Sequence, residues 1–320
     1  MAKPKVAAAQ KQRAASAPLM RTAEEIELWK AERRAAREAK RAKQRAENVG
    51  RAEAMRAERL AHPVALGSKS KLGRRTALPL NVGCSGWFYW HWKRCFYPAD
   101  LSTKDWFDYY AARFKTVELN APFYSWPTAA TVRTWLKQAG RRNFVYTVKV
   151  CELITHVKRF DGTKTLVRDF GYIADILGPR FGCFLFQLPP SFHYTPGRLR
   201  SIIGQLEPHR RNVVEFRHAS WWNDEVYAAF KAAGIIFCSC SGPRLPDVLV
   251  KTAPDVYVRF HGTTRWYRHN YSRYELELWA ERIAAAGAER SWIYFNNDND
   301  CYAIGNARTL QRLLKRQLSP

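Results

Sequence analysis

Short apolar runs alternate with helical patterns along most of the chain. Runs typical of strands occur at residues 80–84, 116–120, 144–150, 183–188, 213–217, 235–240, 256–261 and 292–296. Helical patterns occur at residues 103–114, 128–139, 163–177, 196–206, 224–233, 272–287 and 303–318. Around residues 245–251, between the sixth and seventh strands, no full helical pattern is present. Strand and helix therefore alternate almost regularly from residue 80 onward.

This alternation predicts an α/β fold of the TIM type, a (β/α)8 barrel, for residues 80–320. Repeated β-α-β units imply parallel strands that are covered on both faces. An open doubly wound sheet is the alternative. Gly83-Cys84-Ser85-Gly86 follows the first strand, however, and is not the Gly-x-Gly-x-x-Gly pattern of dinucleotide-binding sheets. No Gly-Lys-Ser/Thr loop is present either, which excludes a P-loop nucleotide site.

Residues 1–79 lack the alternation and are expected to form a basic extension and linker. Thr22 and Glu25 have the spacing of a capping box and predict the start of a helix. That helix is expected to reach about Leu60, with an interruption at Asn48-Val49-Gly50. Because no heptad repeat is sustained along it, a coiled coil is not expected.

The chain is strongly basic, with a formal net charge of +25. Residues 1–76 contain 20 Lys and Arg against 8 Asp and Glu. Such an excess indicates a polyanionic partner or substrate, most commonly nucleic acid. Solvated helix faces explain the same charge about equally well in the remainder of the chain, and a solvated, fraying extension does so in the N-terminal residues. Residues 1–21 are expected to be disordered, and 62–79 to be a linker.

Cysteine content and hydropathy indicate where the protein resides. The seven cysteines form no Cys-x-x-Cys motif and several lie in expected strands, which indicates buried thiols in a reducing compartment. No apolar run approaches the roughly 18 residues of a membrane span. The Ala-rich, basic residues 1–21 are compatible with a transit peptide, but no cleavage pattern follows them. We expect a cytoplasmic protein with no membrane partner.

The most informative stretch is residues 212–222, Asn-Val-Val-Glu-Phe-Arg-His-Ala-Ser-Trp-Trp. In a strand, Glu215 and Arg217 share one face with Val213. Charged side chains on a buried strand are costly unless they pair with each other or with a ligand. Both lie at the C-terminal end of the strand, where parallel barrels place their sites.

Other strands carry polar residues in the same phase near their C-terminal ends. These residues are Glu118, Asn120, Lys149, Gln187, Arg259, His261 and Asn296. Each alone could equally be a structural ion pair or hydrogen bond. Their recurrence over several strands predicts one site at the C-terminal mouth of the barrel.

Two carboxylates and one histidine are the candidates for acid–base chemistry. Glu215 is the expected general base, and Glu118 or His261 the acid. A lone histidine is as often a hydrogen-bonded core residue. No His-x-His or His-Glu-x-x-His spacing is present, so neither a metal nor another cofactor is expected.

Cationic, amide and aromatic side chains complete the predicted site. Those expected to hold an anion such as a phosphate are Lys149, Arg217 and Arg259. Those expected to orient the ligand are Asn120, Gln187 and Asn296. Tyr124 and Trp221 suit stacking on a sugar or base, although packing of loops explains such rings equally well.

An ordered set of motifs resembles the YecE-like family, a domain of unknown function (DUF72). The motifs are Gly83-Cys84-Ser85-Gly86-Trp87, Phe96-Tyr97-Pro98, Glu118-Leu119-Asn120, Phe186-Gln187-Leu188-Pro189-Pro190, Val214-Glu215-Phe216-Arg217-His218, Arg259-Phe260-His261-Gly262 and Asn296-Asn297-Asp298. The resemblance spans about residues 80–316 and implies a TIM-type barrel. The family's activity is not established, and its likeness to endonuclease IV-type barrels has suggested DNA binding. Pro122 departs from the Ser or Thr usual in the family.

We therefore expect an enzyme that binds an anionic, phosphate-bearing ligand at the barrel mouth and acts by carboxylate acid–base hydrolysis. One alternative is a nucleic-acid-binding protein without catalysis, in which the basic N-terminal residues form an arm. Another is a barrel that binds a small metabolite without turnover. The pattern of residues names neither the substrate nor the oligomeric state.

Overall fold

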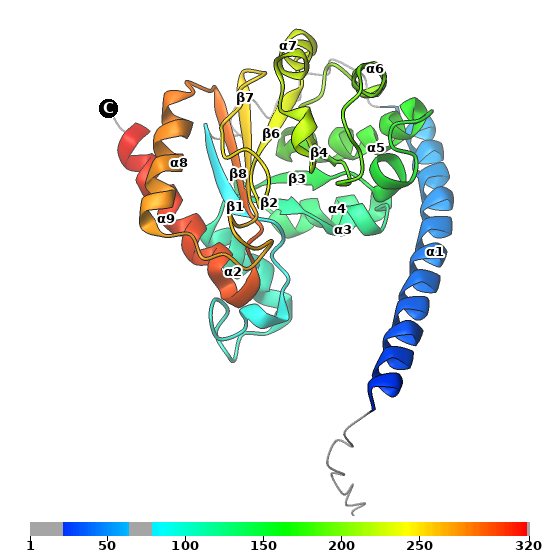
Figure 1. The fold of residues 1–320 in the computed structure, drawn as a ribbon, viewed down its shortest axis with the longest axis horizontal. Coiled ribbons are helices and arrows are strands. Elements are labelled where there is room, and N and C mark those ends of the chain that lie inside the picture. The colour runs from blue at the N-terminus through cyan, green and yellow to red at the C-terminus, as the bar shows by residue number, and fades with distance from the viewer. Residues whose placement is uncertain (1–21, 64–78, 319–320) are drawn as a thin grey trace, which may run out of the picture. The chain divides into compact units, whose positions relative to one another are not determined.

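The computed structural model describes residues 22–63 and 79–318 (Figure 1). Eight parallel strands form one sheet with the order β1-β8-β7-β6-β5-β4-β3-β2. The strands are β1 (Leu80–Cys84), β2 (Thr116–Leu119), β3 (Val145–Lys149), β4 (Phe181–Gln187), β5 (Asn212–Glu215), β6 (Ile236–Ser241), β7 (Asp255–Phe260) and β8 (Arg290–Phe295). The sheet curls into a nearly closed barrel, and the predicted TIM-type fold is confirmed.

Helices connect the strands on the outside of the barrel. They are α2 (Trp106–Arg113), α3 (Ala121–Tyr124), α4 (Ala129–Ala139), α5 (Lys164–Leu177), α6 (Pro196–Gln205), α7 (Asp224–Ala233), α8 (Arg273–Ala285) and α9 (Tyr302–Leu318). Among the described residues, no helix lies between β6 and β7, as predicted. The last two helices, α8 and α9, lie side by side, and α9 packs against β1 and β8 (Figure 1).

A tyrosine hydroxyl joins the two end strands of the sheet, β1 and β2. The Tyr110 hydroxyl accepts a hydrogen bond from the Cys84 N–H at 2.9 Å and donates one to the Thr116 carbonyl at 3.0 Å. Gly83 on β1 also requires this close approach, because an added Cβ would lie 2.4 Å from the Thr116 carbonyl oxygen. Side-chain and backbone contacts thus close the barrel where the strand ladder does not.

Two apolar clusters build the core. The smaller one fills the barrel interior and comprises Val145, Cys183, Leu185, Val213, Ile236, Cys238, Cys240, Tyr257, Trp292 and Tyr294. The larger one lies between the strands and the surrounding helices. Because successive strand residues face opposite sides, each strand contributes alternate residues to the two clusters.

The N-terminal helix α1 (Ala23–Ala61) begins with the predicted capping box. The Glu25 N–H donates to the Thr22 hydroxyl at 3.2 Å, and the Thr22 N–H donates to the Glu25 carboxylate at 2.8 Å. The chain divides into two compact units between Arg45 and Ala46, inside this helix. Predictions for residues 1–21 and for most of the linker at 62–79 lie outside the described residues.

The predicted interruption of α1 near residue 50 was wrong. The helix is continuous through Gly50, which costs about 1 kcal/mol relative to alanine in a helix interior. Contacts between this part of the helix and the barrel domain offset this cost. The buried Asn48 amide donates to the Tyr124 carbonyl at 3.0 Å and accepts from the Trp126 N–H at 2.9 Å, and Met55 is buried as well.

The cysteines follow the prediction only in part. Five are buried free thiols, namely Cys84, Cys151, Cys183, Cys238 and Cys240. Cys95 and Cys301 form a disulfide instead, with their Cα atoms 6.5 Å apart. The pairing escapes the sequence because 206 residues separate the two cysteines, and only the fold brings their loops together. None of the helices in the described part of the chain is long and apolar enough to cross a membrane.

Candidate functional site at the barrel mouth

Arg259 lies at the centre of the polar layer near the C-terminal ends of the strands. Its guanidinium donates to Glu215 on β5 at 2.6 Å and to Glu118 on β2 at 2.5 Å. The other oxygen of the Glu118 carboxylate accepts from the Tyr257 hydroxyl at 2.5 Å, and Ser85 donates to the first at 2.6 Å. One arginine therefore bridges carboxylates from two strands, β2 and β5, that are not neighbours in the sheet.

A second ion pair extends this network toward solvent. Arg217 donates to the remaining oxygen of Glu215. His261 Nε2 lies 3.1 Å from an Arg217 nitrogen and 3.4 Å from the Glu215 carboxylate. Its Nδ1 lies 3.3 Å from the Asn296 amide nitrogen. The network therefore joins Glu118, Arg259, Glu215, Arg217 and His261, as the strand phases predict.

The charges in this network fix its ionisation state. Burial alone would raise the pKa of Glu215, but the Arg217 and Arg259 guanidinium groups hold that pKa well below its usual value. Burial lowers the pKa of His261 well below its usual value, and the same two arginines add to this effect. Glu215 is accordingly an anion and His261 a neutral ring at neutral pH.

Other predicted residues lie around the network but do not bond to it directly. Lys149 ends β3, is 9 % exposed, and places its Nζ 4.0 Å from the centroid of the Phe123 ring. The Asn120 amide donates to the Ser85 carbonyl at 3.1 Å. The Gln187 amide donates to a neighbouring backbone carbonyl at 2.7 Å.

The two predicted stacking rings occupy different environments. Tyr124 is 58 % exposed at the surface of α3 and is available to a ligand. Trp221 is fully buried between Phe216 and Phe192, with near-parallel rings at centroid distances of 3.9 and 5.6 Å. Its indole N–H donates to the Phe192 carbonyl at 2.6 Å. Trp221 therefore packs in the core and is not exposed to a ligand.

A pocket of about 580 Å³ opens above this network. Its lining residues are Pro190, Arg217, His218, Ala219, Pro243, Arg244, Trp266 and Tyr267. The Arg217 guanidinium lies 4.4 Å from the centroid of the Trp266 ring, which holds it in place. Arg244 and Tyr267 have φ values of 64° and 68°, a left-handed conformation that non-glycine residues adopt mainly where function or packing demands it.

One group of potential metal ligands lies inside the described barrel. Glu215, Cys238 and Cys240 place their ligand atoms within 4.8 Å of one another, all buried. The Glu215 oxygen nearest to Cys238 already accepts from Arg259 at 2.6 Å. Arg259 thus already pairs with the carboxylate oxygen that a metal would have to share, so the donor set fits a metal poorly.

Comparison with known families identifies the barrel. The sequence profile of the family described as "Protein of unknown function DUF72" matches residues 81–320. The chain belongs to the DUF72 family. The resemblance inferred from the strand-end motifs is thereby confirmed.

Relatives of this DUF72 chain agree with the fold. The UPF0759 protein YunF of Bacillus subtilis is 24 % identical over 279 residues, which cover 75 % of this chain and 96 % of that protein. A crystal structure of a DUF72 protein from Thermotoga maritima is 26 % identical, with a TM-score of 0.68, covering 74 % of this chain and all of that one. A DUF72 protein from Enterococcus faecalis, 19 % identical with a TM-score of 0.63, covers 75 % of this chain and 96 % of its own.

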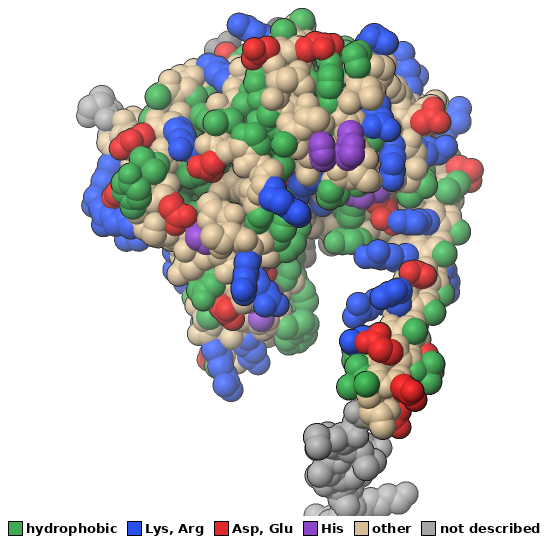
Figure 2. Space-filling view, viewed as in Figure 1, with side chains coloured by type: hydrophobic (Ala, Val, Ile, Leu, Met, Phe, Trp, Pro, Cys, Tyr) green, Lys and Arg blue, Asp and Glu red, His purple; other side chains and the backbone are tan. Residues whose placement is uncertain are grey.

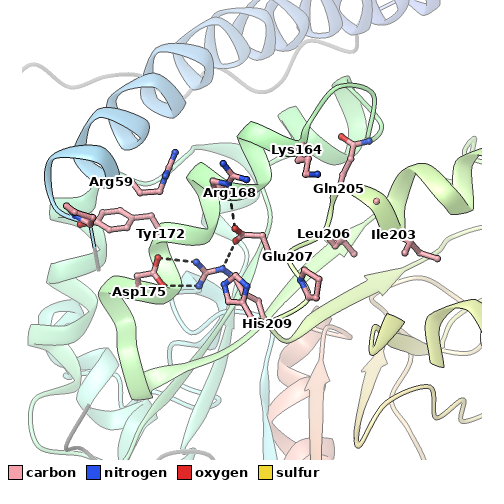
Figure 3. Close-up of a pocket in the computed structure, with 14 residues that line it drawn as sticks. Arg59, Lys164, Arg168, Tyr172, Asp175, Ile203, Gln205, Leu206, Glu207 and His209 are labelled. Atoms are coloured by element: carbon pink, nitrogen blue, oxygen red, sulfur yellow. Dashed lines mark hydrogen bonds and ion pairs between the residues drawn. The ribbon is translucent and has the colours of Figure 1, made fainter. Parts of the chain in front are cut away.

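A larger pocket in this DUF72 barrel lies away from the mouth (Figure 3). Its volume is about 750 Å³, and it lies between α5, α6 and the end of α1. Arg210 dominates it and donates to Asp175 at 3.0 Å through two nitrogens and to Glu207 at 2.7 Å. These residues precede β5, at the end of the barrel that usually serves stability. Asp175 and Glu207 line this pocket, whereas no carboxylate among the described residues lines the mouth pocket, so the mouth is the better candidate for an anion site.

Sequence reasoning missed three residues that shape the DUF72 mouth. Tyr257 holds Glu118, and its position two residues before Arg259 on β7 gives it the same strand phase, so alternation could have found it. Ser85 donates to Glu118 and has the same strand phase as Gly83, but in the sequence it is marked only as part of the Gly83–Trp87 motif. Arg244 lies in the helix-free segment after β6, where no periodic pattern marks it.

Proposed function

We propose that the barrel mouth binds an anionic ligand, most simply one that carries a phosphate group. The observation that carries this proposal is the lining of the mouth pocket, which contains Arg217 and Arg244 and no carboxylate. The nearest acid, Glu215, is compensated by Arg259 as well as by Arg217. Positive charge in a concave, partly dry site favours phosphate and carboxylate groups.

Aromatic side chains give the same pocket a second kind of contact. Trp266 and Tyr267 line it beside the two arginines, and rings of this kind stack on sugars and bases. A phosphorylated sugar or a nucleotide would satisfy both the cationic and the aromatic parts of the lining. This combination supports a phosphate-bearing organic ligand over inorganic phosphate alone.

Hydrolysis is the reaction that we propose for this ligand, with Glu215 as the base and Glu118 or His261 as the acid. The acid would first have to take up a proton, because Glu118 is paired with Arg259 and His261 is a neutral ring. The arginines that lower the pKa of Glu215 also make it a weaker base. Arg217 would have to release one oxygen of Glu215 before that oxygen could accept a proton. Binding is therefore the part of the proposal that the geometry supports better.

Calorimetric titration with glycerol 3-phosphate and AMP, with neutral glycerol as a reference, tests the binding. Arg244 is exposed and has no ion pair in the described residues, so Arg244→Ala should fold normally. Losing one charge-assisted contact of about 1.5–3 kcal/mol should weaken Kd by roughly 10- to 100-fold. Arg312→Ala on α9, outside the pocket, is the matched control. Wild-type affinity in Arg244→Ala, or no phosphorylated ligand bound at all, would overturn the proposal.

The catalytic part has a separate test. Wild type and Glu215→Gln are screened against phosphorylated sugars, nucleotides and abasic DNA, with thermal unfolding as a check on folding. Turnover by wild type that falls by about 100-fold or more in Glu215→Gln would support a base at this position. Wild type inert on every substrate would remove hydrolysis and leave the binding site to be judged by calorimetry.

Nucleic-acid binding is the second candidate, because the first part of α1 presents charge on all sides. Between residues 23 and 45 the helix has eight Lys and Arg against five Asp and Glu. Almost every side chain in this segment is exposed (Figure 2). A helix that is polar all round gains little from burial, and a nucleic-acid backbone is one surface that it suits.

A further inference from the structure

The amine of Lys149 is buried without a carboxylate partner. Nζ lies 4.0 Å from the centroid of the Phe123 ring, and His156 packs on the same ring at a centroid distance of 4.9 Å. Within the described residues the amine makes no ion pair, because Arg217 and Arg259 occupy the carboxylates of the neighbouring network. Lys149 therefore differs from Arg217 and Arg259, whose charges are compensated by Glu215 and Glu118.

The surroundings of this amine favour its neutral form. Burial and the positive charge of Arg259 lower the pKa of Lys149 to about 7, and Arg217 adds to the effect. Glu215 and Glu118 act in the opposite direction but do not restore the usual value. At pH 7 about half of the amine is neutral, against roughly one molecule in 2,500 for an ordinary lysine of pKa about 10.4.

We propose that Lys149 is a nucleophilic amine that forms a Schiff base with an aldehyde or ketone bearing an anionic group. The neutral amine attacks the carbonyl carbon and a C–N bond forms. The carbonyl oxygen leaves as water together with the two amine hydrogens. The imine then takes a proton from solvent and becomes an iminium ion, so the step needs neither an oxidant nor a reductant.

The two halves of this ligand rest on different residues. The anionic half rests on the proposed function, in which Arg217 and Arg244 hold a phosphate. Lys149 does not itself line that pocket; Arg217, which lines it and whose charge acts on the amine, is the link between the two. The carbonyl half rests on Lys149 alone. A lysine that served only to hold an anion would keep its proton, whereas a buried lysine close to cations loses it readily and becomes reactive.

Reductive trapping with a matched pair of aldehydes tests the inference. The full-length protein is incubated near neutral pH with glyceraldehyde 3-phosphate or with neutral glyceraldehyde in the presence of cyanoborohydride. Modified lysines are then located by peptide mass spectrometry. We expect Lys149 to be modified at least about tenfold faster than any other lysine, because far more of its amine is neutral. The phosphorylated aldehyde should react faster than the neutral one.

Lys149→Arg is the control variant, since it keeps a cation in place but cannot form the imine; near-UV circular dichroism confirms its fold. In this variant the fast modification assigned to Lys149 should disappear, and the slower modification of the other lysines should be unchanged. Equal reaction of both aldehydes at Lys149 would support the amine and overturn the anionic half of the ligand. Modification spread evenly over the lysines, with Lys149 no faster, would overturn the Schiff base. Binding of glycerol 3-phosphate would still be judged separately by calorimetry.

Discussion

At the scale of single residues, Arg259 and Lys149 show two outcomes for a cation buried in the same layer. Arg259 is fully buried, and carboxylates from β2 and β5 hold it charged, with its pKa well above the usual value. Lys149 has no such partner, and its pKa falls to about 7. The difference follows from hydrogen-bond geometry, because one planar guanidinium can reach two carboxylates at once.

The lowered pKa of Lys149 predicts a pH dependence of stability. The unfolded chain binds this proton up to pH about 10.5 and the folded chain only to about 7, so stability should rise with pH between these values. A shift of this size corresponds to at most about 5 kcal/mol. Chemical denaturation gives the free energy of unfolding of wild type and Lys149→Met across this pH range. The difference between the two pH profiles is the contribution of the Lys149 titration.

The surface substitution Lys104→Met controls for the loss of any lysine. Relative to that control, Lys149→Met should be more stable near pH 7 and lose its advantage toward pH 10. A difference profile that stays flat over this range would mean that Lys149 is solvated in the folded protein.

At the scale of elements, Asn48 and Arg51 tie the second part of α1 to the segment after β2, and Asn48 makes the buried contacts. Asn48 is fully buried and makes hydrogen bonds to the backbone on both sides of Ser125, one as donor and one as acceptor. Arg59 near the end of the helix donates to the buried Asp169 on α5 at 2.8 and 3.0 Å. These contacts explain why the helix continues past a glycine that would weaken it in isolation.

Replacing Asn48 by alanine is expected to lower the free energy of unfolding by about 2–4 kcal/mol. Two buried backbone groups would lose their partners, while alanine itself favours the helix, so any loss reports the missing hydrogen bonds. Urea unfolding measures the change. Glu53→Ala, on the exposed face of the same helix, should have an effect within about 0.5 kcal/mol. Equal effects of the two substitutions would mean that Asn48 does not anchor the helix.

At the scale of the whole molecule, the net charge of +25 is shared between the N-terminal residues and the barrel. If nucleic acid is a partner, exposed cations should contribute through counterion release. We expect duplex DNA binding to weaken with salt, and Arg37, Lys40 and Arg41 changed together to Gln to reduce the salt slope by about 2–3. Fluorescence anisotropy at several salt concentrations measures both quantities.

A matched triple change on the barrel, Lys104, Arg312 and Arg316 to Gln, removes the same charge from exposed positions elsewhere. If the two triple variants weaken binding equally, net charge alone is responsible and the N-terminal helix has no special role. If neither changes the slope, nucleic acid is not held by these surfaces.

Much of the barrel was predictable because period and composition are local properties. The strand phases directed Glu118, Glu215, Arg217, Arg259 and His261 to one end, and the structure joins these five in one network. A side chain's face follows from the two-residue repeat of a strand, whatever the neighbouring strand is. The capping box of Thr22 and Glu25 was predictable for a similar reason, because its two hydrogen bonds join residues only three positions apart.

The sequence by itself determined the repeating units, the faces of their polar residues and the family. Only the tertiary structure decided which groups are partners: Arg259 takes both carboxylates, Lys149 is left without one, and Trp221 lies in the core. Partner choice depends on distances between segments far apart along the chain. Periodicity fixes the direction of a side chain but not the atoms that it meets, and those atoms set its charge and reactivity.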